Sequence, residues 1–272
     1  SVPTMEPLPL LLVLLAGTLA TGSPLRRPDF GGAIREIDLD MAPKCFDDQY
    51  RGCRTRMLKR LPLLNNTEFA SNRIYAEVWA NVSAQYQRVP GTRLRPDQAI
   101  ALRAYTMDTE LYKKFNRAVR VGGRSRREYL RKFNFKVLHF LITEALSALR
   151  KPNSCFHVYR GVRGIRFITQ PGQIVRFGQF ASSSPKKEVA SKYGNDTFFE
   201  VDTCHGASIR AFSAFPEQEE VLIPPFETFF VTGVTRQGEK TLINLDSHGT
   251  HSKYNCEWVR GDIPGVGTPP VG

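Results

Sequence analysis

Three short segments carry the residues best suited to chemistry, because each sets polar groups against an apolar, strand-like background. They are Val158–Gly161 (VYRG), Phe177–Ser184 (FGQFASSS) and Phe215–Pro225 (FPEQEEVLIPP). An arginine such as Arg160 can hold an anion through charge-assisted hydrogen bonds, and a carboxylate such as Glu220 can stabilise a developing positive charge. Taken singly, each segment also has a structural interpretation, as half of an ion pair, a helix cap or a solvated acidic turn.

Several common catalytic signatures are missing from the sequence. It contains no GxSxG, HExxH, GxGxxG or phosphate-binding P-loop motif, and no CxxC pair that would indicate zinc. His139 lies within a helical pattern and His157 begins a strand-like run, so both are interpreted as structural. We predict neither a metal site nor a permanently bound cofactor.

The elements that must position the three segments divide into a helical half and a strand half. Residues 46–150 have mostly helical patterns, clearest in Phe135–Leu149, Asn72–Tyr86 and Pro96–Met107. After Asn153 the pattern changes to short strand-like runs, namely Phe156–Val162, Ile174–Phe180, Thr197–Asp202, Ser208–Phe212, Glu220–Ile223, Thr228–Val234 and Thr241–Leu245. Helices followed by strands predict an α+β fold in which helices pack against antiparallel sheets.

Charge is distributed unevenly along the chain. The 272 residues carry a formal net charge of +12, and the hydrophobic share of 41% excludes overall disorder. Residues 51–136 hold 20 Lys and Arg against 6 Asp and Glu, a local net charge of +14. Clustered basic residues attract polyanions, such as sulfated glycans or nucleic acid, through counterion release.

The N-terminus predicts export from the cell. The apolar run Leu8–Ala20 is followed by small residues, as in a secretory signal peptide that would be cleaved near Gly22. No other run approaches the ~20 apolar residues of a transmembrane helix, and Gly261–Gly272 lacks the hydrophobic tail of a lipid-anchor signal. We therefore expect a secreted protein without a transmembrane segment, for which nucleic acid is not a partner.

Cysteine content and glycosylation motifs agree with an extracellular location. Five cysteines suit two disulfides and one odd thiol in an oxidising compartment. Asn-x-Ser/Thr motifs make three asparagines candidate glycosylation sites, namely Asn65, Asn81 and Asn195.

Together, and in this order after a helical half, the three polar segments resemble the arginine–serine–glutamate signature of mono-ADP-ribosyltransferases. The resemblance is to the vertebrate arginine-directed enzymes that are secreted or attached to the cell surface. It extends to Phe46–Tyr50 (FDDQY) with Cys53, to Phe135–Phe140 (FKVLHF) and to Glu220–Glu227 (EVLIPPFE). It covers residues 38–258 and implies a helical N-terminal part packed on two antiparallel β-sheets that flank an NAD cleft.

The resemblance also implies a domain organisation and a disulfide pairing. Residues 45–258 would form the catalytic domain, mainly helical over 45–152 and mainly strand over 153–258. A signal peptide (1–22) and a lead-in (23–44) would precede it, and a flexible tail (259–272) would follow. The expected disulfides are Cys53–Cys256 and Cys155–Cys204, with Cys45 unpaired.

By the same resemblance, the substrate is NAD, with NADP left open as an alternative, and the acceptor is a protein arginine. Arg160 positions NAD by charge-assisted hydrogen bonds, a task that suits a forked donor better than lysine. Ser182 supports the site and helps to orient the glutamate. Glu220 bonds a ribose hydroxyl and stabilises the oxocarbenium-like sugar that forms as the bond to nicotinamide breaks. Further contacts to NAD are expected from Tyr105, Gln179 and Ser213.

One position departs from the family's pattern. Counted back from Glu220, the first glutamate of the family's Glu-x-Glu falls on Gln218. In the family that glutamate engages the acceptor guanidinium, whereas a neutral amide loses the charge and cannot take a proton. On an extended strand Gln218 would share a face with Glu220, and Glu217 and Glu219 would point the other way.

Three functions follow from these observations. The first is a secreted enzyme that transfers ADP-ribose from NAD to protein arginine and releases nicotinamide. The second is an NAD glycohydrolase on the same fold, which Gln218 favours. The third is an inactive family member that acts as a basic glycan-binding module, motivated by the positive charge of residues 51–136.

Overall fold

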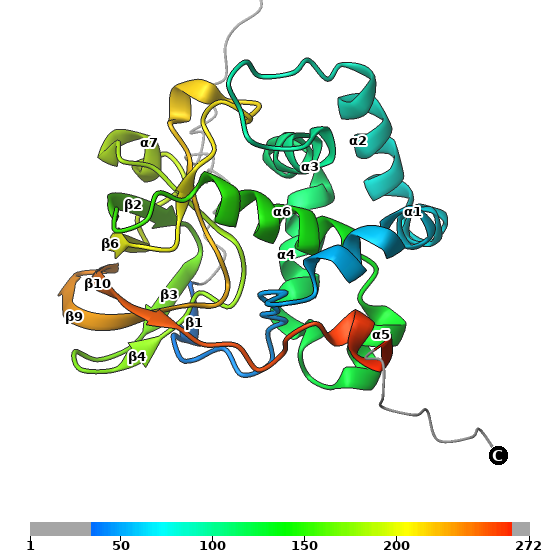
Figure 1. The fold of residues 1–272 in the computed structure, drawn as a ribbon. Helices are drawn as coiled ribbons and strands as arrows, with labels where there is room; N and C mark the ends of the chain where they lie inside the picture. Colours follow the sequence, from blue (N-terminus) through cyan, green and yellow to red (C-terminus); the bar gives the residue numbers. More distant parts are fainter. Residues whose placement is uncertain (1–33, 263–272) are drawn as a thin grey trace, which may run out of the picture. The chain divides into compact units, whose positions relative to one another are not determined.

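Helices make up the first half of the chain that the structure describes. The computed structural model describes residues 34–262, and Figure 1 shows its helices grouped beside its strands. The helices are α1 (Arg54–Ser71), α2 (Arg73–Ala84), α3 (Pro96–Thr106), α4 (Glu110–Gly122), α5 (Arg126–Lys132), α6 (Lys136–Leu149) and a short α7 (Lys187–Ser191). The three predicted helices are confirmed as α2, α3 and α6, with their ends shifted by no more than two residues.

Local sequence explains where several helices begin. The side chain of Ser125 accepts a hydrogen bond from the backbone N–H of Glu128 at 3.1 Å and thereby caps α5. Pro96 occupies the first turn of α3, where its missing N–H would have had no partner in the helix. The sequence pattern did not single out α1, which contains Pro62 and whose N-cap residue, Cys53, makes no side-chain capping hydrogen bond.

The strands of residues 34–262 form three sheets. A five-stranded sheet has the order β2-β6-β10-β9-β4, a three-stranded sheet has the order β5-β8-β7, and β1 pairs with β3. The strands are β1 (Arg35–Asp38), β2 (Phe156–Val162), β3 (Ile165–Ile168), β4 (Ile174–Val175), β5 (Ala181–Ser183), β6 (Thr197–Thr203), β7 (Ala207–Ser208), β8 (Val221–Ile223), β9 (Glu227–Gln237) and β10 (Lys240–Thr250). The described part of the chain also contains two short 3-10 helices, η1 (Pro216–Gln218) and η2 (Glu257–Asp262).

The prediction of purely antiparallel sheets is wrong for two strand pairs, since β1 runs parallel to β3 and β10 runs parallel to β6. Within the five-stranded sheet, β10 runs parallel to β6, with Thr241 opposite Thr197 and Asp246 opposite Asp202. The chain leaves β6, adds β7 and β8 to the other sheet, and returns through the β9–β10 hairpin. The long crossover lets β10 pair with β6 in the parallel sense, which a hairpin between neighbouring strands does not allow.

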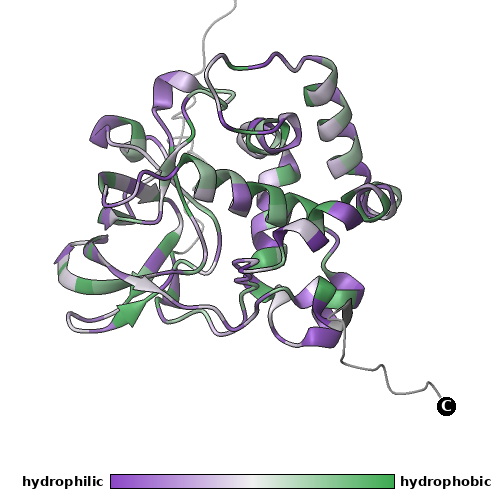
Figure 2. Ribbon diagram, in the orientation of Figure 1, coloured by the Kyte–Doolittle hydropathy of each residue, from purple (hydrophilic) through white to green (hydrophobic). Residues whose placement is uncertain are grey.

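The central strand of the smaller sheet separates two hydrophobic cores. Leu222 of β8 belongs to the core shared with the helices, together with Phe180 and the apolar side of α6, which Figure 2 colours mostly as hydrophobic. Val221 and Ile223 point to the opposite face and pack with residues of the five-stranded sheet. Because side chains alternate along a strand, these three consecutive apolar residues of β8 pack into both cores. The three-stranded sheet is thereby held between the helices and the five-stranded sheet.

Two buried aspartates tie the start of the described chain to its end. Asp47 accepts backbone N–H bonds from Lys253 and Tyr254 and pairs with Arg176 at 2.7 Å. Asp48 accepts from the backbone N–H of Cys256 at 2.9 Å, and the expected disulfide Cys53–Cys256 closes the same junction. The acidic pair in the FDDQY segment is thus structural.

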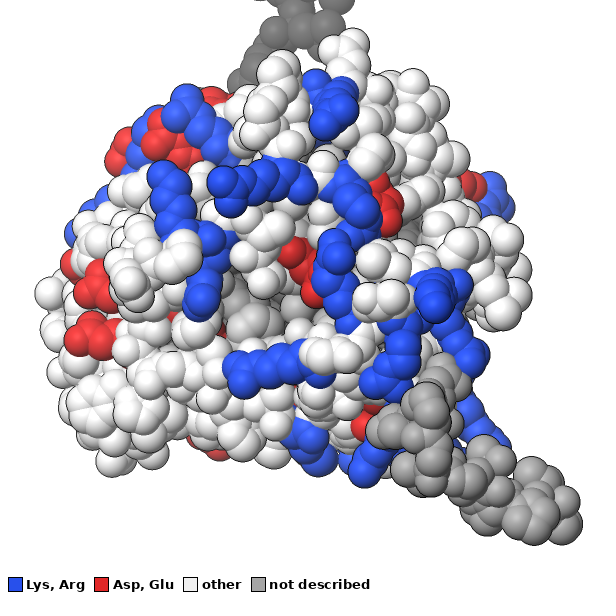
Figure 3. Space-filling model, viewed as in Figure 1, with Lys and Arg blue, Asp and Glu red and all other residues white. Residues whose placement is uncertain are grey.

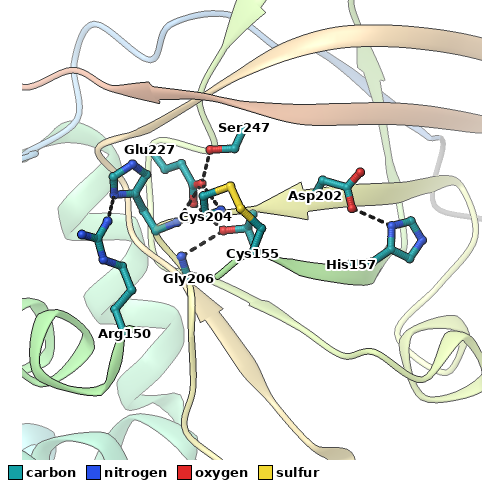
Figure 4. The surroundings of a disulfide bond; sticks show 10 residues. Arg150, Cys155, His157, Asp202, Cys204, Gly206, Glu227 and Ser247 are labelled. Atoms are coloured by element: carbon teal, nitrogen blue, oxygen red, sulfur yellow. Dashed lines mark hydrogen bonds and ion pairs between the residues drawn. A yellow bond between two sulfur atoms is a disulfide. The ribbon is translucent and has the colours of Figure 1, made fainter. Parts of the chain in front are cut away.

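The second expected disulfide is also present. Cys155 and Cys204 join the approach to β2 to the end of β6, and Figure 4 shows Glu227 beside this bond. Glu227 is fully buried and accepts four hydrogen bonds, from the backbone N–H groups of Cys204 and His205 and from the hydroxyls of Thr203 and Ser247. Cys45 is free, as expected, and it is buried.

The surface carries more basic than acidic side chains on the face that Figure 3 draws. On this face, Lys and Arg are spread widely while Asp and Glu are sparse.

Within residues 34–262 no helix is long and apolar enough to cross a membrane. The expected signal peptide at residues 1–22 lies outside the described residues, as does most of the expected flexible tail.

Candidate active site

Arg160 lies in the middle of β2, an edge strand of the five-stranded sheet. Its backbone pairs with Phe199 of β6, and its side chain is half-buried. The guanidinium Nη1 donates a hydrogen bond to the carbonyl oxygen of Ser182 at 2.7 Å. Burial lowers the pKa of Arg160, while the charges of Tyr105 and Glu220 raise it. The guanidinium is therefore held in place, with N–H groups left over for a ligand.

Ser182 is brought to Arg160 by a junction between the two larger sheets. The backbones of Tyr159 and Ser184 exchange hydrogen bonds of 2.8 and 3.0 Å, which joins β2 to the end of β5. In turn β5 pairs with β8, where Ser182 lies opposite Leu222. Ser182 is half-buried. The serine is placed by backbone pairing on both sides, so its position depends on sheet geometry and not on a flexible loop.

Glu220 is the buried carboxylate of the site. It comes directly before β8, and only 8% of its surface is exposed. Desolvation raises its pKa, while a hydrogen bond from Ser182 and the charge of Arg160 lower it. A mostly buried carboxylate in the cavity wall can strongly stabilise a cation that forms beside it.

The residues before Glu220 are not the extended strand that was predicted. Pro216–Gln218 form the 3-10 helix η1, and Glu219 adopts a left-handed conformation with φ 50°. Glu219 points away from the site and pairs with Lys186 and Arg210, each at 3.1 Å. Gln218 and Glu220 nevertheless line the same cavity. The two side chains therefore share one side, as expected, although the backbone between them is not an extended strand.

The remaining candidates for NAD contact have different positions. Tyr105, near the end of α3, is buried, and its hydroxyl donates to the carbonyl oxygen of Phe180 at 3.2 Å. Burial raises the pKa of Tyr105 to about 12, and the charge of Glu220 adds to this. Gln179 lines the cavity and accepts a hydrogen bond from Arg120. Ser213 is buried outside the lining, where its hydroxyl accepts from the backbone N–H of Phe215 at 3.0 Å.

These elements enclose a cavity of about 620 Å³. Of the residues selected from the sequence, Tyr105, Arg160, Gln179, Ser182, Gln218 and Glu220 line it. A cavity of this size suits an organic ligand, and its few polar groups lie among aromatic and apolar side chains. The structure therefore brings together polar residues from all three sequence segments, whereas Glu217, Glu219 and the further candidate Ser213 lie outside the lining.

Sequence reasoning missed several lining residues. Asn116 of α4 donates to the Tyr105 hydroxyl at 3.0 Å and to the Phe180 carbonyl at 3.1 Å. Tyr112, Tyr193 and Arg163 also line the cavity. No local motif marks Asn116, because its role arises only from the packing of α4 against α3.

The two histidines considered in the sequence lie outside the cavity lining. His139 is fully buried between Tyr50 and Phe46, and burial lowers its pKa to about 3. His157 pairs with Asp202, whose hydrogen bond raises the pKa of the imidazole. Both contacts are those of structural histidines.

Among the candidate glycosylation sites, Asn81 is exposed, and Asn65 and Asn195 are partly exposed.

The fold and this cavity define an ADP-ribosyltransferase. In the solved structure of the eucaryotic mono-ADP-ribosyltransferase ART2.2, 98% of the chain superimposes on 81% of this one, with a TM-score of 0.70 and 36% sequence identity. A mutant of ART2.2 has been solved in complex with NAD, and it matches with a TM-score of 0.65 and 37% identity.

Sequence comparison narrows the class further. The chain belongs to the NAD:arginine ADP-ribosyltransferase family, whose sequence model matches residues 39–253. NAD(P)(+)--arginine ADP-ribosyltransferase 2 of Gallus gallus is 49% identical, over 98% of this chain and 89% of that protein. GPI-linked NAD(P)(+)--arginine ADP-ribosyltransferase 1 of Homo sapiens is 44% identical, over 95% and 85%. The chain is thus an enzyme whose substrate is NAD, as the sequence resemblance predicted.

Proposed function

We propose that this enzyme transfers ADP-ribose from NAD to a guanidinium nitrogen of arginine in an acceptor protein and releases nicotinamide. The observation that carries the proposal is the convergence of Arg160, Ser182 and Glu220 on one cavity, with Glu220 buried. Membership of the arginine ADP-ribosyltransferase family and the names of its relatives support arginine as the acceptor.

NAD binding relies on the groups fixed around the cavity. Arg160 uses one N–H for the Ser182 carbonyl and has others to donate to a phosphate of the dinucleotide. The aromatic side chains of Tyr105, Tyr112 and Tyr193 supply flat surfaces for the rings of the ligand. These contacts orient the bond between ribose and nicotinamide toward Glu220.

The reaction is a substitution at the ribose C1′ atom. As the bond from C1′ to the ring nitrogen breaks, its electron pair passes to nicotinamide, which leaves as a neutral molecule. Positive charge then develops on the ribose, where the carboxylate of Glu220 stabilises it electrostatically. An arginine nitrogen forms the new bond to C1′ and loses one proton to solvent. Gln218 cannot accept this proton, because an amide is not a base at neutral pH.

Hydrolysis of NAD is the competing outcome at the same site. Water can replace arginine as the nucleophile whenever the acceptor is held poorly, and the neutral side chain of Gln218 supplies no charge to hold a guanidinium. The names of the relatives support transfer over hydrolysis. We therefore place hydrolysis second, as a side reaction whose share depends on Gln218.

The test uses NAD labelled in the nicotinamide and in the adenylate, with and without agmatine as a small guanidino acceptor. We expect nicotinamide release together with ADP-ribosylated agmatine. Free ADP-ribose as the sole product that carries the adenylate label would replace the proposed transfer with hydrolysis. No release of nicotinamide would contradict both enzymatic functions. Repeating the assay with NADP tests whether the enzyme shares the wider substrate range that its relatives' names indicate.

We also propose that the enzyme acts outside the cell, as a secreted glycoprotein. Both disulfides are compatible with an oxidising compartment, and relatives carry names such as ecto-ADP-ribosyltransferase 5 of Bos taurus. Expression of the full chain in animal cells tests this proposal. Enzyme in the medium, with mobility that shifts on removal of N-linked glycans, is the expected result. Retention of unglycosylated protein inside the cells would contradict it.

Sulfated glycans are a further proposed partner, through the basic residues of the helical half. The local net charge of +14 in residues 51–136 and the spread of Lys and Arg in Figure 3 support this. Retention on a heparin column that falls steeply with salt concentration is expected. Elution at the same low salt as a neutral protein would contradict it.

A further inference from the structure

Tyr193 lines the cavity from a segment that packs against β2. It follows α7, and 55% of its surface is exposed although it lines the cavity. The segment packs directly on the strand: a Cβ atom at Gly161 would lie 2.3 Å from the carbonyl oxygens of both Ala190 and Gly194. Gly194 itself adopts φ 132°, a conformation that favours glycine. These glycines hold the backbone of Tyr193 close to Arg160.

Gln218, across the cavity, is held at both its backbone and its side chain. The hydroxyl of Ser184 donates to the backbone carbonyl oxygen of Gln218 at 2.7 Å. The hydroxyl of Tyr193 donates to the side-chain oxygen Oε1 of Gln218, also at 2.7 Å. The amide nitrogen Nε2 has no hydrogen-bond partner within the described part of the chain, so the two donors of this amide remain available.

This orientation is unfavourable for a guanidinium. Arginine has five N–H donors and no acceptor, so it needs an oxygen from Gln218 and is not bound by the amide N–H₂ group. The Tyr193 hydroxyl already takes one of the two lone pairs of the only oxygen of this amide side chain, so a guanidinium would have to share that oxygen with the tyrosine. Water can both donate and accept hydrogen bonds, so the same amide can hold it. The Tyr193–Gln218 pair thus discriminates against the acceptor that the family uses.

We propose that Tyr193 is a positioning residue, which orients the amide of Gln218 and thereby sets the partition of ADP-ribose between arginine and water. The proposal rests on the proposed function, since it concerns the acceptor step of that reaction. Tyr193 acts through Gln218, so its effect must depend on which side chain stands at position 218. A carboxylate there would have two oxygens, one for the tyrosine and one for the guanidinium.

The experiment is a double-mutant cycle with Tyr193→Phe and Gln218→Ala, and with Gln218→Glu as a third background. Phenylalanine keeps the aromatic ring in the cavity and removes only the hydroxyl. With labelled NAD and agmatine, the ratio of ADP-ribosylagmatine to free ADP-ribose is measured for each variant, together with nicotinamide release and the KM for NAD.

In the natural background, Tyr193→Phe should raise the ratio about three- to tenfold, the equivalent of one freed hydrogen-bond acceptor. The same change should have no effect beside Gln218→Ala, and less than about a twofold effect beside Gln218→Glu. An unchanged or lowered ratio in the single variant, or an equal rise beside Gln218→Ala, would overturn the inference while nicotinamide release upholds the enzyme function. Absence of nicotinamide release from the unmodified enzyme would overturn both.

Discussion

Replacement of Glu220 by glutamine isolates the charge of the carboxylate. Glutamine has nearly the same shape, and it can still accept the hydrogen bond from Ser182, so the cavity should keep its form. Glu220 is 8% exposed. A carboxylate about 4 Å from a unit positive charge, at an effective dielectric constant of about 20, contributes about 4 kcal/mol. Since ~1.4 kcal/mol corresponds to a factor of ten, we expect kcat to fall about a thousandfold.

Binding of NAD should change much less than turnover. The ground-state sugar carries far less positive charge than the transition state, so the carboxylate acts mainly on the latter. Nicotinamide release from labelled NAD gives kcat, and equilibrium binding of labelled NAD gives Kd. The matched control is Glu217→Gln, because Glu217 is exposed and lies outside the cavity lining. Full turnover by Glu220→Gln, or a loss explained by weaker NAD binding alone, would refute the assignment of Glu220.

Three further predictions concern the acceptor and the stability of the fold. Gln218→Glu should raise the ratio of transfer to hydrolysis at least tenfold, because it restores a charge worth about 1.5 kcal/mol or more to a guanidinium hydrogen bond; an unchanged product ratio in the agmatine assay would exclude this role. Replacing Cys155 and Cys204 by serine should lower the free energy of unfolding by about 4 kcal/mol, since the bond closes a loop with a sequence separation of 49, and equilibrium urea unfolding measures it. His139 has a pKa of about 3 in the folded protein, so the unfolded chain binds the extra proton below about pH 6.5 and stability falls on acidification. His139→Gln should reduce this loss between pH 6 and pH 4, and equal slopes for both proteins would contradict the burial argument.

The sequence predicted the class of fold well because its two halves have different periodicities. The apolar spacing in α6 and the alternation in β2 lie within the local sequence, and both elements are found within one residue of the predicted bounds. The predicted run Ile174–Phe180 was wrong as one strand: β4 ends at Val175, and Arg176 turns inward to Asp47. An apolar run alone does not show where a buried charge ends a strand.

The site could be predicted in part. Arg160, Ser182 and Glu220 were selected because each is a polar residue beside strand-like sequence, in an order that resembles a known signature. Their convergence depends on the pairing of β5 with β8 and on the contact between Tyr159 and Ser184. The position of Ser213 was not predictable, since its side chain turns to the backbone of Phe215 and away from the cavity.

By itself, the sequence determined the types of residue available for chemistry, the helical and strand halves, the uneven charge and the number of cysteines. These properties depend on side-chain chemistry and local periodicity, which neighbouring residues specify. Tertiary structure alone decided that β10 pairs with β6 in parallel, that Asn116 supports Tyr105, and that Gln218 is held by Tyr193. Such contacts join residues far apart in the chain. Backbone geometry and packing bring them together, and no local pattern encodes the pairing.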